Sequence, residues 1–351
     1  MLNYDHLLAM SDETGMLQFA QLNNPDPASG YTLDDNARAL MVALHMEEDA
    51  YFHSRRYLNF LANAQRRDGT WSNFLLDGIY YSRFDSEDSI GRAIMACAAA
   101  SRSSWPDLAA LGGRLISNKL TDLPAFSSPR AIAYSLVGLC SGNIPCPDVF
   151  LAQVVRRLAD FLIGRYECTR GRHWRWFENY LTYCNAILPQ ALLCVHEFNG
   201  NEQCLRVGKK SLDFLNDTLF RPGYLSIVGN AGWYQRGGSV PLYDQQPVDA
   251  ASMVFANWQA YKVLGSREYL ELAHLAKRWY EGENIHGLAM VDETSGGCYD
   301  ALTPDGVNLN QGAEAVLSML LSELLLEAAD NSIPLFLGEG PVPQLDAGAS
   351  C

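Results

Sequence analysis

Acidic residues stand at the start of several predicted helices, beside amides or aromatic residues. The clearest case is Tyr31–Leu40, YTLDDNARAL, in which Asp34 and Asp35 lead directly into an apolar helix. Carboxylates in a first helical turn cap free N–H groups and face the positive end of the helix dipole, so each one alone has an ordinary structural role. The repetition of this layout indicates a shared rim of acids instead. The further acids at helix starts are Glu87, Asp88, Glu178, Asp249 and Glu314.

A rim of carboxylates can perform general acid–base catalysis. Cleavage of a glycosidic bond needs one acid to protonate the leaving oxygen and one carboxylate to activate water or attack the anomeric carbon. Glu178, which follows Trp176 and Phe177, is the expected general acid, because an apolar setting raises the pKa of a carboxyl group. Asp35, Asp88 and Asp249 are the expected bases or anchors for hydroxyl groups, because a helix N-terminus favours the ionised form. Helix capping remains the alternative for each of them.

The predicted loops beside these acids are rich in aromatic rings and amides. Flat apolar rings beside polar groups suit sugars, which have apolar faces and hydroxyl edges. Loop packing is the alternative for any single ring, and Glu314 either points into the cleft or caps its helix. For Arg38 and Arg92, which follow acids by three or four residues, an intrahelical ion pair is favoured over a substrate contact. The residues expected to contact a sugar are Tyr31, Asp34, Asn36, Trp71, Glu87, Trp176, Trp233, Tyr243, Gln246, Asn310 and Glu314.

The helices that must position these residues alternate between two kinds. One kind begins with a polar motif and is then rich in Ala, Leu and Met, which predicts burial on both faces. These helices start near 34, 87, 128, 180, 248 and 311. The other kind carries Arg, Lys and Glu on one side, as outer helices do, and is expected at 51–64, 105–118, 148–165, 202–218 and 266–281, with helix 4–10 as the sixth. The pattern predicts an all-α (α/α)6 barrel of six inner and six outer helices.

Loop lengths predict where the cleft of this barrel lies. Turns on one side are short, whereas loops of about 12 to 30 residues precede the inner helices on the other side, which places a cleft there. Residues 1–330 are expected to form a single barrel domain, and residues 331–351 an irregular or disordered tail. Strand content is expected to be small, with room for short hairpins within 220–247 and 285–303.

Composition excludes several classes of function. The chain has 351 residues, a formal net charge of −14 and a pI of about 4.9, so it is not expected to bind nucleic acid. It opens on polar residues without a leader, and no apolar run approaches the roughly 18–20 residues of a membrane span. The nine cysteines are scattered without CxxC spacing, which indicates buried, reduced thiols. We expect a cytoplasmic protein with no metal site, no cofactor and no thiol nucleophile.

Other catalytic motifs are absent from the sequence. Seven histidines show no HExxH or paired metal spacing, and only His173 and His286 fall in predicted cleft loops. There is no GxSxG, P-loop or Rossmann GxGxxG motif. Asp34–Asp35 superficially resembles the aspartate boxes of terpene enzymes, but neither DDxxD nor DxDD is present. The segment 65–71, QRRDGTW, resembles the Gln/Trp repeat of triterpene cyclases, but it occurs once and is interpreted as a turn.

Five motifs in order resemble a bacterial family of (α/α)6 domains. They are YTLDDNARAL at 31–40, SEDSIGRA at 86–93, WFENYLTYCNAILPQA at 176–191, DQQPVDA at 244–250 and NLNQGAEA at 308–315. That family occurs alone or fused behind glycosyltransferases, and the resemblance spans about residues 4–328. It implies a fold like that of six-hairpin glycosidases and a glycan-related role, without a mechanism to carry over. The family has Asp or Asn where this chain has Cys184, and Ser where it has Ala315, so a substrate contact at Cys184 is in doubt.

These observations favour a glycan-active enzyme, with hydrolysis of an oligosaccharide by paired carboxylates as the first hypothesis. A sugar epimerase or isomerase on the same barrel is the first alternative, and it would need two histidines facing each other in the cleft. A phosphorylase would need an anion pocket made by Arg130, Arg236 or His173. A non-catalytic glycan-binding domain that assists a glycosyltransferase would keep the aromatic rings without a catalytic carboxyl pair. The expected partners are therefore an oligosaccharide or small-molecule substrate and a glycosyltransferase.

Overall fold

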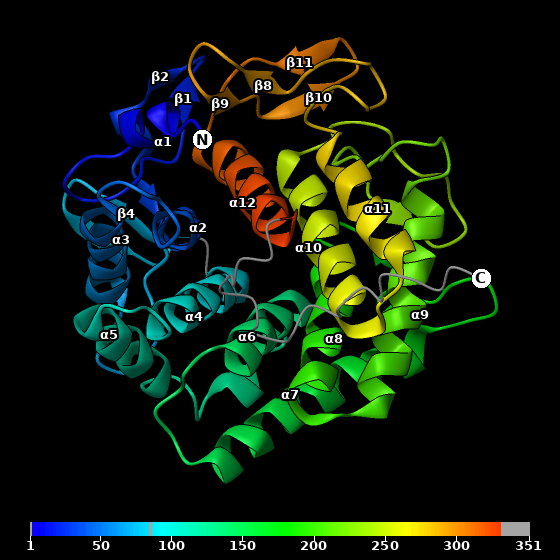
Figure 1. Cartoon of the computed structure of the whole chain (residues 1–351), viewed down its shortest axis with the longest axis horizontal. Helices are drawn as coiled ribbons and strands as arrows, with labels where there is room; N and C mark the ends of the chain where they lie inside the picture. Colours follow the sequence, from blue (N-terminus) through cyan, green and yellow to red (C-terminus); the bar gives the residue numbers. More distant parts are fainter. Residues whose placement is uncertain (1, 84–85, 331–351) are drawn as a thin grey trace, which may run out of the picture.

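The computed structural model describes residues 2–83 and 86–330, and the tail expected at 331–351 lies outside the described residues. Within that part of the chain the helices form two concentric rings (Figure 1). The inner helices are α2 (Leu33–Ala43), α4 (Glu87–Ser101), α6 (Pro129–Ser141), α8 (Ile187–Asn199), α10 (Pro247–Leu264) and α12 (Ala313–Asp330). The outer helices are α1 (Asp5–Ala9), α3 (Ala50–Ala64), α5 (Pro106–Ser117), α7 (Asp148–Thr169), α9 (Glu202–Leu219) and α11 (Arg267–Lys277).

The inner helices close the ring because each packs on the next and α12 packs on α2. Their Ala- and Leu-rich sequences leave little charge to hydrate, so most residues of α4 and α12 are buried, as burial on both faces requires. The outer helices are amphipathic. In α9, for example, Val207, Leu212 and Leu215 are buried while Lys209 and Lys210 are exposed. The short α1 packs on α12 and completes the outer ring. The predicted (α/α)6 barrel is confirmed.

Strands are short and lie in the loops. They are β1 (Ala20–Gln21), β2 (Asn24–Pro25), β3 (Tyr31–Thr32), β4 (Phe74–Leu76), β5 (Ile79–Tyr81), β6 (Tyr180–Leu181), β7 (Tyr234–Gln235), β8 (Val291–Asp292), β9 (Gly297–Cys298), β10 (Ala301–Thr303) and β11 (Gly306–Asn308). Single 3₁₀ turns occupy Pro27–Ser29 and Leu123–Ala125. The hairpin β8–β9 falls within the predicted range 285–303. The predicted hairpin within 220–247 is wrong, because β7 pairs with the distant β6.

One inner helix begins later than its sequence indicates. A start near 180 was expected, but α8 begins at Ile187. Tyr180 and Leu181 are instead held as a strand against β7, and Cys184 has a φ of 43°. This left-handed backbone conformation cannot belong to a right-handed helix. The acid at 178 therefore lies in a loop, whereas Asp34, Asp88, Asp249 and Glu314 lie in first helical turns.

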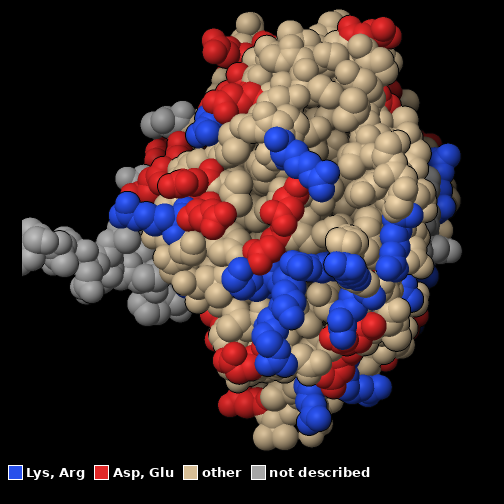
Figure 2. Space-filling model, turned by 90° about the vertical axis from the view of Figure 1, so that its right-hand side faces the viewer, with Lys and Arg blue, Asp and Glu red and all other residues tan. Residues whose placement is uncertain are grey.

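Basic side chains gather on one face of the molecule. Figure 2 shows many Lys and Arg side chains on the face that it draws, although the chain carries a net charge of −14. The outer helices α9 and α11 lie on that side (Figure 1), and α9 contributes the exposed Arg206, Lys209 and Lys210. Among the described residues, no helix is both long and apolar enough to cross a membrane.

The close packing of α4 on α6 depends on glycine. A methyl group at Gly91 would lie 2.7 Å from the backbone oxygen of Ala131, closer than non-bonded atoms approach. We therefore expect Gly91→Ala to lower the free energy of unfolding by about 1–3 kcal/mol, measured by urea denaturation. Gly164→Ala on α7 is the control, since nothing lies within 4 Å of its added methyl group. It should raise stability by about 0.5–1 kcal/mol through the gain in helix propensity. Equal effects at both positions would contradict the packing argument.

Candidate active site

Three of the predicted acids, Asp34, Asp35 and Glu314, meet at the N-terminal ends of α2 and α12, beside the start of α10. A cavity of about 350 Å³ opens there, lined by Asp34 and Asp35 of α2, Glu314 of α12, and the loop acids Asp244 and Asp300. Amides of Gln18, Asn230, Gln246 and Asn308 also line it. Acids and amides around one cavity supply acceptors and donors for a ligand rich in hydroxyl groups.

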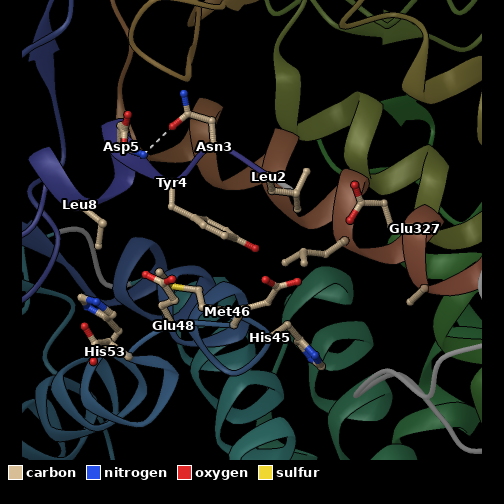
Figure 3. Close-up of a pocket in the computed structure, with 14 residues that line it drawn as sticks. Leu2, Asn3, Tyr4, Asp5, Leu8, His45, Met46, Glu48, His53 and Glu327 are labelled. Carbon is tan, nitrogen blue, oxygen red and sulfur yellow. Dashed lines mark hydrogen bonds between the residues drawn. The ribbon is translucent and has the colours of Figure 1, made fainter.

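A larger cavity of about 700 Å³ lies at the opposite end of α2 and α12. Its walls come from the chain start, the turn after α2 and the end of α12, for example Tyr4, Glu48 and Glu327, whose side chains face a common space in Figure 3. Burial lowers the pKa of His45, which also lines it, to about 4. None of the sequence-predicted site residues lines this cavity, so the smaller cavity is the candidate active site.

Arg38 bridges two carboxylates of the candidate site. Its Nη1 donates to Asp35 Oδ1 at 2.9 Å, and its Nη2 donates to Glu314 Oε2 at 2.5 Å. The guanidinium is buried, whereas the Glu314 side chain is 43% exposed. The expected intrahelical pair with Asp35 is confirmed, but Arg38 also bridges α2 and α12, which sequence spacing could not show.

Arg92 does not pair with the acid of its own helix, so the intrahelical pair expected there is wrong. Its Nη1 lies 3.5 Å from Asp34 Oδ2 on α2, and its Nη2 donates to the Tyr134 hydroxyl at 3.1 Å. Asp88 of α4 is held by neutral donors instead, accepting from Ser128 Oγ at 2.5 Å and from the Tyr183 hydroxyl. Asp88 is buried and does not line the cavity. Asp88, expected as a base or an anchor for hydroxyl groups, is thus not brought to this cavity, and it holds the Tyr183 hydroxyl.

Glu178 is committed to a buried ion pair. Its Oε2 accepts from Arg130 Nη1 at 3.0 Å, and both side chains are about 95% buried. The same arginine donates to the Tyr183 carbonyl at 2.7 Å and to Asn185 Oδ1 at 3.2 Å. Glu178 is absent from the lining of the cavity. Glu178, expected as the general acid, is thus not brought to this cavity, and its carboxylate fixes Arg130 and the loop before α8.

Asp35 has the properties that the sequence assigned to Glu178. Burial, and after it the negative charge of Asp34, raise the pKa of its carboxyl group to about 7, although Arg38 opposes the shift. Thr32 Oγ1 donates to its other oxygen at 2.5 Å. The helix dipole, which favours ionisation, is outweighed by the loss of hydration. Burial thus brings the pKa of Asp35, on the wall of the cavity, close to neutral pH.

Asp249 is a second buried carboxyl group with a raised pKa. It is 5% exposed, and its Oδ1 accepts from the Cys184 N–H at 2.6 Å. Its Oδ2 has no hydrogen-bond partner among the described residues, and burial raises its pKa to about 7. Cys184 makes this contact in its left-handed conformation, which Asn and Asp adopt more readily than other non-glycine residues.

Asp249 should make stability fall as the pH rises. Because its folded-state pKa of about 7 lies above the ordinary value of 3.8, the folded protein binds its proton more tightly, so stability is lost as the pH rises from about 4 through about 7. Asp249→Asn keeps the acceptor for the Cys184 N–H but does not titrate. We therefore expect its free energy of unfolding to fall less than that of wild type between these pH values, by on the order of 1–3 kcal/mol. Urea denaturation at both ends of the range measures this, with the exposed Asp217→Asn as control. Equal pH dependence in wild type and Asp249→Asn would contradict the assignment.

Several predicted sugar contacts have structural roles instead. Trp71 is 3% exposed and donates to the Leu61 carbonyl, and Trp176 is fully buried. The prediction that these rings contact a sugar is corrected, because both belong to the core. Asn36 is also buried, bonded to the backbone of Met16 and Thr32. Glu87 accepts from the backbone N–H groups of Ser127 and Ser128 before α6, so it caps the neighbouring helix.

The remaining predicted contacts lie in the half-buried loops around the inner helix starts. Tyr31 donates to Asp12 at 2.5 Å, Trp233 lies 6.2 Å from the ring of Tyr183, and Tyr243 stacks on His286 at 5.3 Å. Asn310 accepts from the Leu22 N–H at 2.9 Å. Of the predicted set, the structure brings Asp34, Asp35, Gln246 and Glu314 together on the cavity wall.

The sequence missed other residues that line the cavity. Those with polar or aromatic side chains are Gln18, Phe19, Asn230, Asp244 and Asp300. All lie in loops, where spacing carries no periodic signal. Burial raises the pKa of Asp300. The hydrogen bond that Asp300 Oδ1 accepts from the Gly312 N–H at 2.7 Å opposes this shift. The described residues contain no group of three or more His, Cys, Asp and Glu side chains placed to hold a metal ion.

No family model matches the chain, and no curated protein matches its sequence. Solved structures do match. A sugar epimerase from a ruminal bacterium has a TM-score of 0.72 at 13% identity, over 95% of this chain and 96% of the epimerase. Cellobiose 2-epimerase from Spirochaeta thermophila has a TM-score of 0.67 at 16% identity, over 92% of both chains. A GH76 α-mannanase from Bacteroides thetaiotaomicron has a TM-score of 0.61 at 11% identity, over 86% of this chain and 87% of the mannanase. These matches show the fold alone, a barrel found in both sugar epimerases and glycoside hydrolases.

Proposed function

We propose that this chain is a glycan-active enzyme that hydrolyses a glycosidic bond of an oligosaccharide. One observation carries the proposal: Asp35, with a pKa of about 7, shares the wall of one cavity with the more exposed carboxylates of Asp34 and Glu314. Glycoside hydrolysis requires this combination of a protonated carboxyl group and an ionised one. The similarity of the fold to a mannanase and to sugar epimerases supports the choice of a sugar as substrate.

In the proposed reaction Asp35 donates its proton to the glycosidic oxygen as the bond from that oxygen to the anomeric carbon breaks. Glu314, bonded to Arg38 at 2.5 Å, accepts a proton from water while the water oxygen bonds to the anomeric carbon. The Glu314 side chain is 43% exposed, so water can reach it. Arg38 contacts both carboxylates, so it holds the charge of Glu314 and fixes the relative positions of acid and base.

Epimerisation is the second candidate, favoured by the similarity of the fold to two epimerases and to a D-mannose isomerase. A facing histidine pair would support it, but none of the residues that line the cavity is a histidine. His286 in a neighbouring loop is bonded to the Thr303 carbonyl at 2.8 Å. The carboxyl groups therefore favour hydrolysis over an epimerisation that depends on histidine.

We further propose that the enzyme works in the cytoplasm, in association with a glycosyltransferase. Eight described cysteines are free, which is typical of a reducing compartment. The glycosyltransferase association rests on the family resemblance of the five motifs. A pull-down of the tagged chain from a cytoplasmic extract tests it, and recovery without any glycosyltransferase would contradict it.

Product analysis tests the proposed reaction. Wild type is incubated with mannose- and glucose-based oligosaccharides, with and without inorganic phosphate, and the products are followed by NMR in D₂O. These sugars are chosen because the matched structures include a mannanase and a cellobiose epimerase. Hydrolysis releases shorter reducing sugars at a rate independent of phosphate. A sugar phosphate would indicate phosphorolysis, deuterium at C2 of an intact sugar would indicate epimerisation, and binding without turnover would indicate a non-catalytic domain. Each of these three results would contradict the proposal.

A further inference from the structure

Phe19 presents an exposed aromatic ring at the candidate active site. Its side chain is 54% exposed, and it lines the same cavity as Asp34, Asp35 and Glu314. The backbone beneath the ring is fixed, because the Phe19 N–H donates to Ser29 Oγ at 3.1 Å and its carbonyl accepts from the Asp26 N–H at 2.9 Å. Single exposed apolar residues are common on protein surfaces. This one differs because its ring lines a cavity that is otherwise rich in acids and amides.

Two exposed leucines accompany the ring. Leu22 and Leu309 are 55% and 49% exposed. The turn that carries Leu22 is tied to the segment before α12, since its N–H donates to Asn310 Oδ1 and its carbonyl accepts from the Gln311 N–H, both at 2.9 Å. Phe19 and Leu22 thus lie on backbone whose N–H and carbonyl groups are both hydrogen-bonded. An apolar ring on fixed backbone beside a polar cavity suits a ligand with an apolar face and polar edges.

The size of the cavity determines what can reach this ring. A volume of about 350 Å³ is near the lower end of the range for small-molecule pockets. It accommodates at least one sugar ring with its hydroxyl groups against the acids and amides, and a longer oligosaccharide extends beyond it. The exposed Phe19, which lines the cavity, is available to a sugar that extends toward solvent. A pyranose presents an apolar C–H face, which packs on an aromatic ring as other apolar surfaces do.

We propose that Phe19 is the platform for the sugar ring that adjoins the one in the cavity, so that the preferred substrate is a disaccharide or longer. This inference rests on the proposed function in assuming a sugar in the cavity, and it adds a second binding position. It also explains why the predicted tryptophans are not required as platforms. Trp71 and Trp176 are buried, and Phe19 presents the apolar ring in their place.

Binding to matched mono- and disaccharides tests the platform. The ligands are mannobiose and cellobiose, with mannose and glucose as their single rings, measured by calorimetry in the Asp35→Asn background to prevent turnover. Phe19→Ala should raise the Kd for the disaccharide about tenfold and change the Kd for the monosaccharide less than about twofold. Phe19→Tyr, which keeps the ring, should bind as the parent does. Phe52→Ala is the matched control, because Phe52 is 59% exposed on the outer helix α3.

Loss of affinity that is equal for mono- and disaccharides, or no loss, would overturn the platform. So would a parent protein that binds neither disaccharide more tightly than its monosaccharide. The result is separable from the proposed reaction. If no bond is cleaved but Phe19→Ala still weakens only the disaccharide, hydrolysis is wrong and the platform stands. If a disaccharide is cleaved and Phe19→Ala binds it unchanged, only the platform is wrong.

Discussion

Replacing Asp35 by asparagine should lower kcat on a cleavable oligosaccharide by about 10²–10⁴-fold, the contribution expected of a general acid. Asparagine keeps the shape of the side chain and an acceptor for Arg38, which bonds Asp35 at 2.9 Å, but it has no proton to give. KM should change little, because the cavity walls stay in place. The measurement is steady-state kinetics of wild type and variant, with the exposed Asp217→Asn as control.

The pH profile gives the same assignment an independent check. Burial raises the pKa of Asp35 to about 7, and a general acid works only in its protonated form. We therefore expect kcat/KM of wild type to fall as the pH rises through about 7. Asp35→Asn should lose this descending limb, because it removes the titrating group. An Asp35→Asn variant with full turnover, or one that keeps the same descending limb, would contradict the role of Asp35.

Removing one partner of the Arg130–Glu178 pair should cause the largest loss of stability. Both side chains are about 95% buried, 3.0 Å apart, and a buried charge left without its counter-ion typically costs about 3–5 kcal/mol. Arg130→Met also removes the donors to the Tyr183 carbonyl and to Asn185. We expect its free energy of unfolding, measured in urea, to fall by that amount. The double variant Arg130→Met/Glu178→Leu should lose less than the sum of the single variants, because no charge remains unpaired.

A surface pair provides the matched control. Arg156 and Asp160 lie 3.7 Å apart on α7, with side chains 80% and 61% exposed, so Arg156→Met should cost less than about 0.5 kcal/mol. Similar losses for Arg130→Met and Arg156→Met would contradict the structural role. Glu178→Gln separates the two interpretations of Glu178. If Glu178 is a general acid, the variant should lose turnover and keep its free energy of unfolding. If Glu178 is a buried counter-ion, the free energy of unfolding of the variant should fall.

The barrel could be predicted from the sequence because its two kinds of helix differ in composition. Inner helices such as α4 are buried on both faces and are apolar all round, whereas α9 keeps Lys209 and Lys210 on one face. A helix buried on both faces and a helix buried on one face have different patterns of apolar residues. These patterns can be read from the sequence without knowing which residues are in contact. The start of α8 could not be predicted in this way. A strand pair with residues 234–235 and the left-handed Cys184 displace it, and neither leaves a periodic signal.

The chemistry of the acids was only partly predictable. Spacing correctly placed Asp34, Asp35 and Glu314 near helix starts, and the structure brings them to one cavity. Which acid is desolvated and which is paired depends on partners far away in the chain. Glu178 pairs with Arg130, and Glu314 pairs with Arg38, which lies 276 residues away in the sequence. Local sequence assigned the raised carboxyl pKa to Glu178 from its aromatic neighbours, whereas burial raises the pKa of Asp35 to about 7.

The aromatic residues show the same limit. Trp176 and Phe19 both lie in loops before inner helices, yet one is fully buried and the other 54% exposed. Trp176 packs against Phe177 and Phe214 of α9, a contact set by the folded barrel. A large ring in a sequence indicates burial or recognition equally well, and only the fold distinguishes the two.

A crystal structure of Asp35→Asn soaked with mannobiose or cellobiose tests the central claim most directly. The two ends of the barrel offer two cavities, one lined by Asp34, Asp35 and Glu314, the other by Tyr4, His45 and Glu327. We predict one sugar ring in the first cavity, with its glycosidic oxygen within hydrogen-bond distance of residue 35. A sugar seated in the second cavity, or in neither, would contradict the assignment of the acid-lined cavity as the active site.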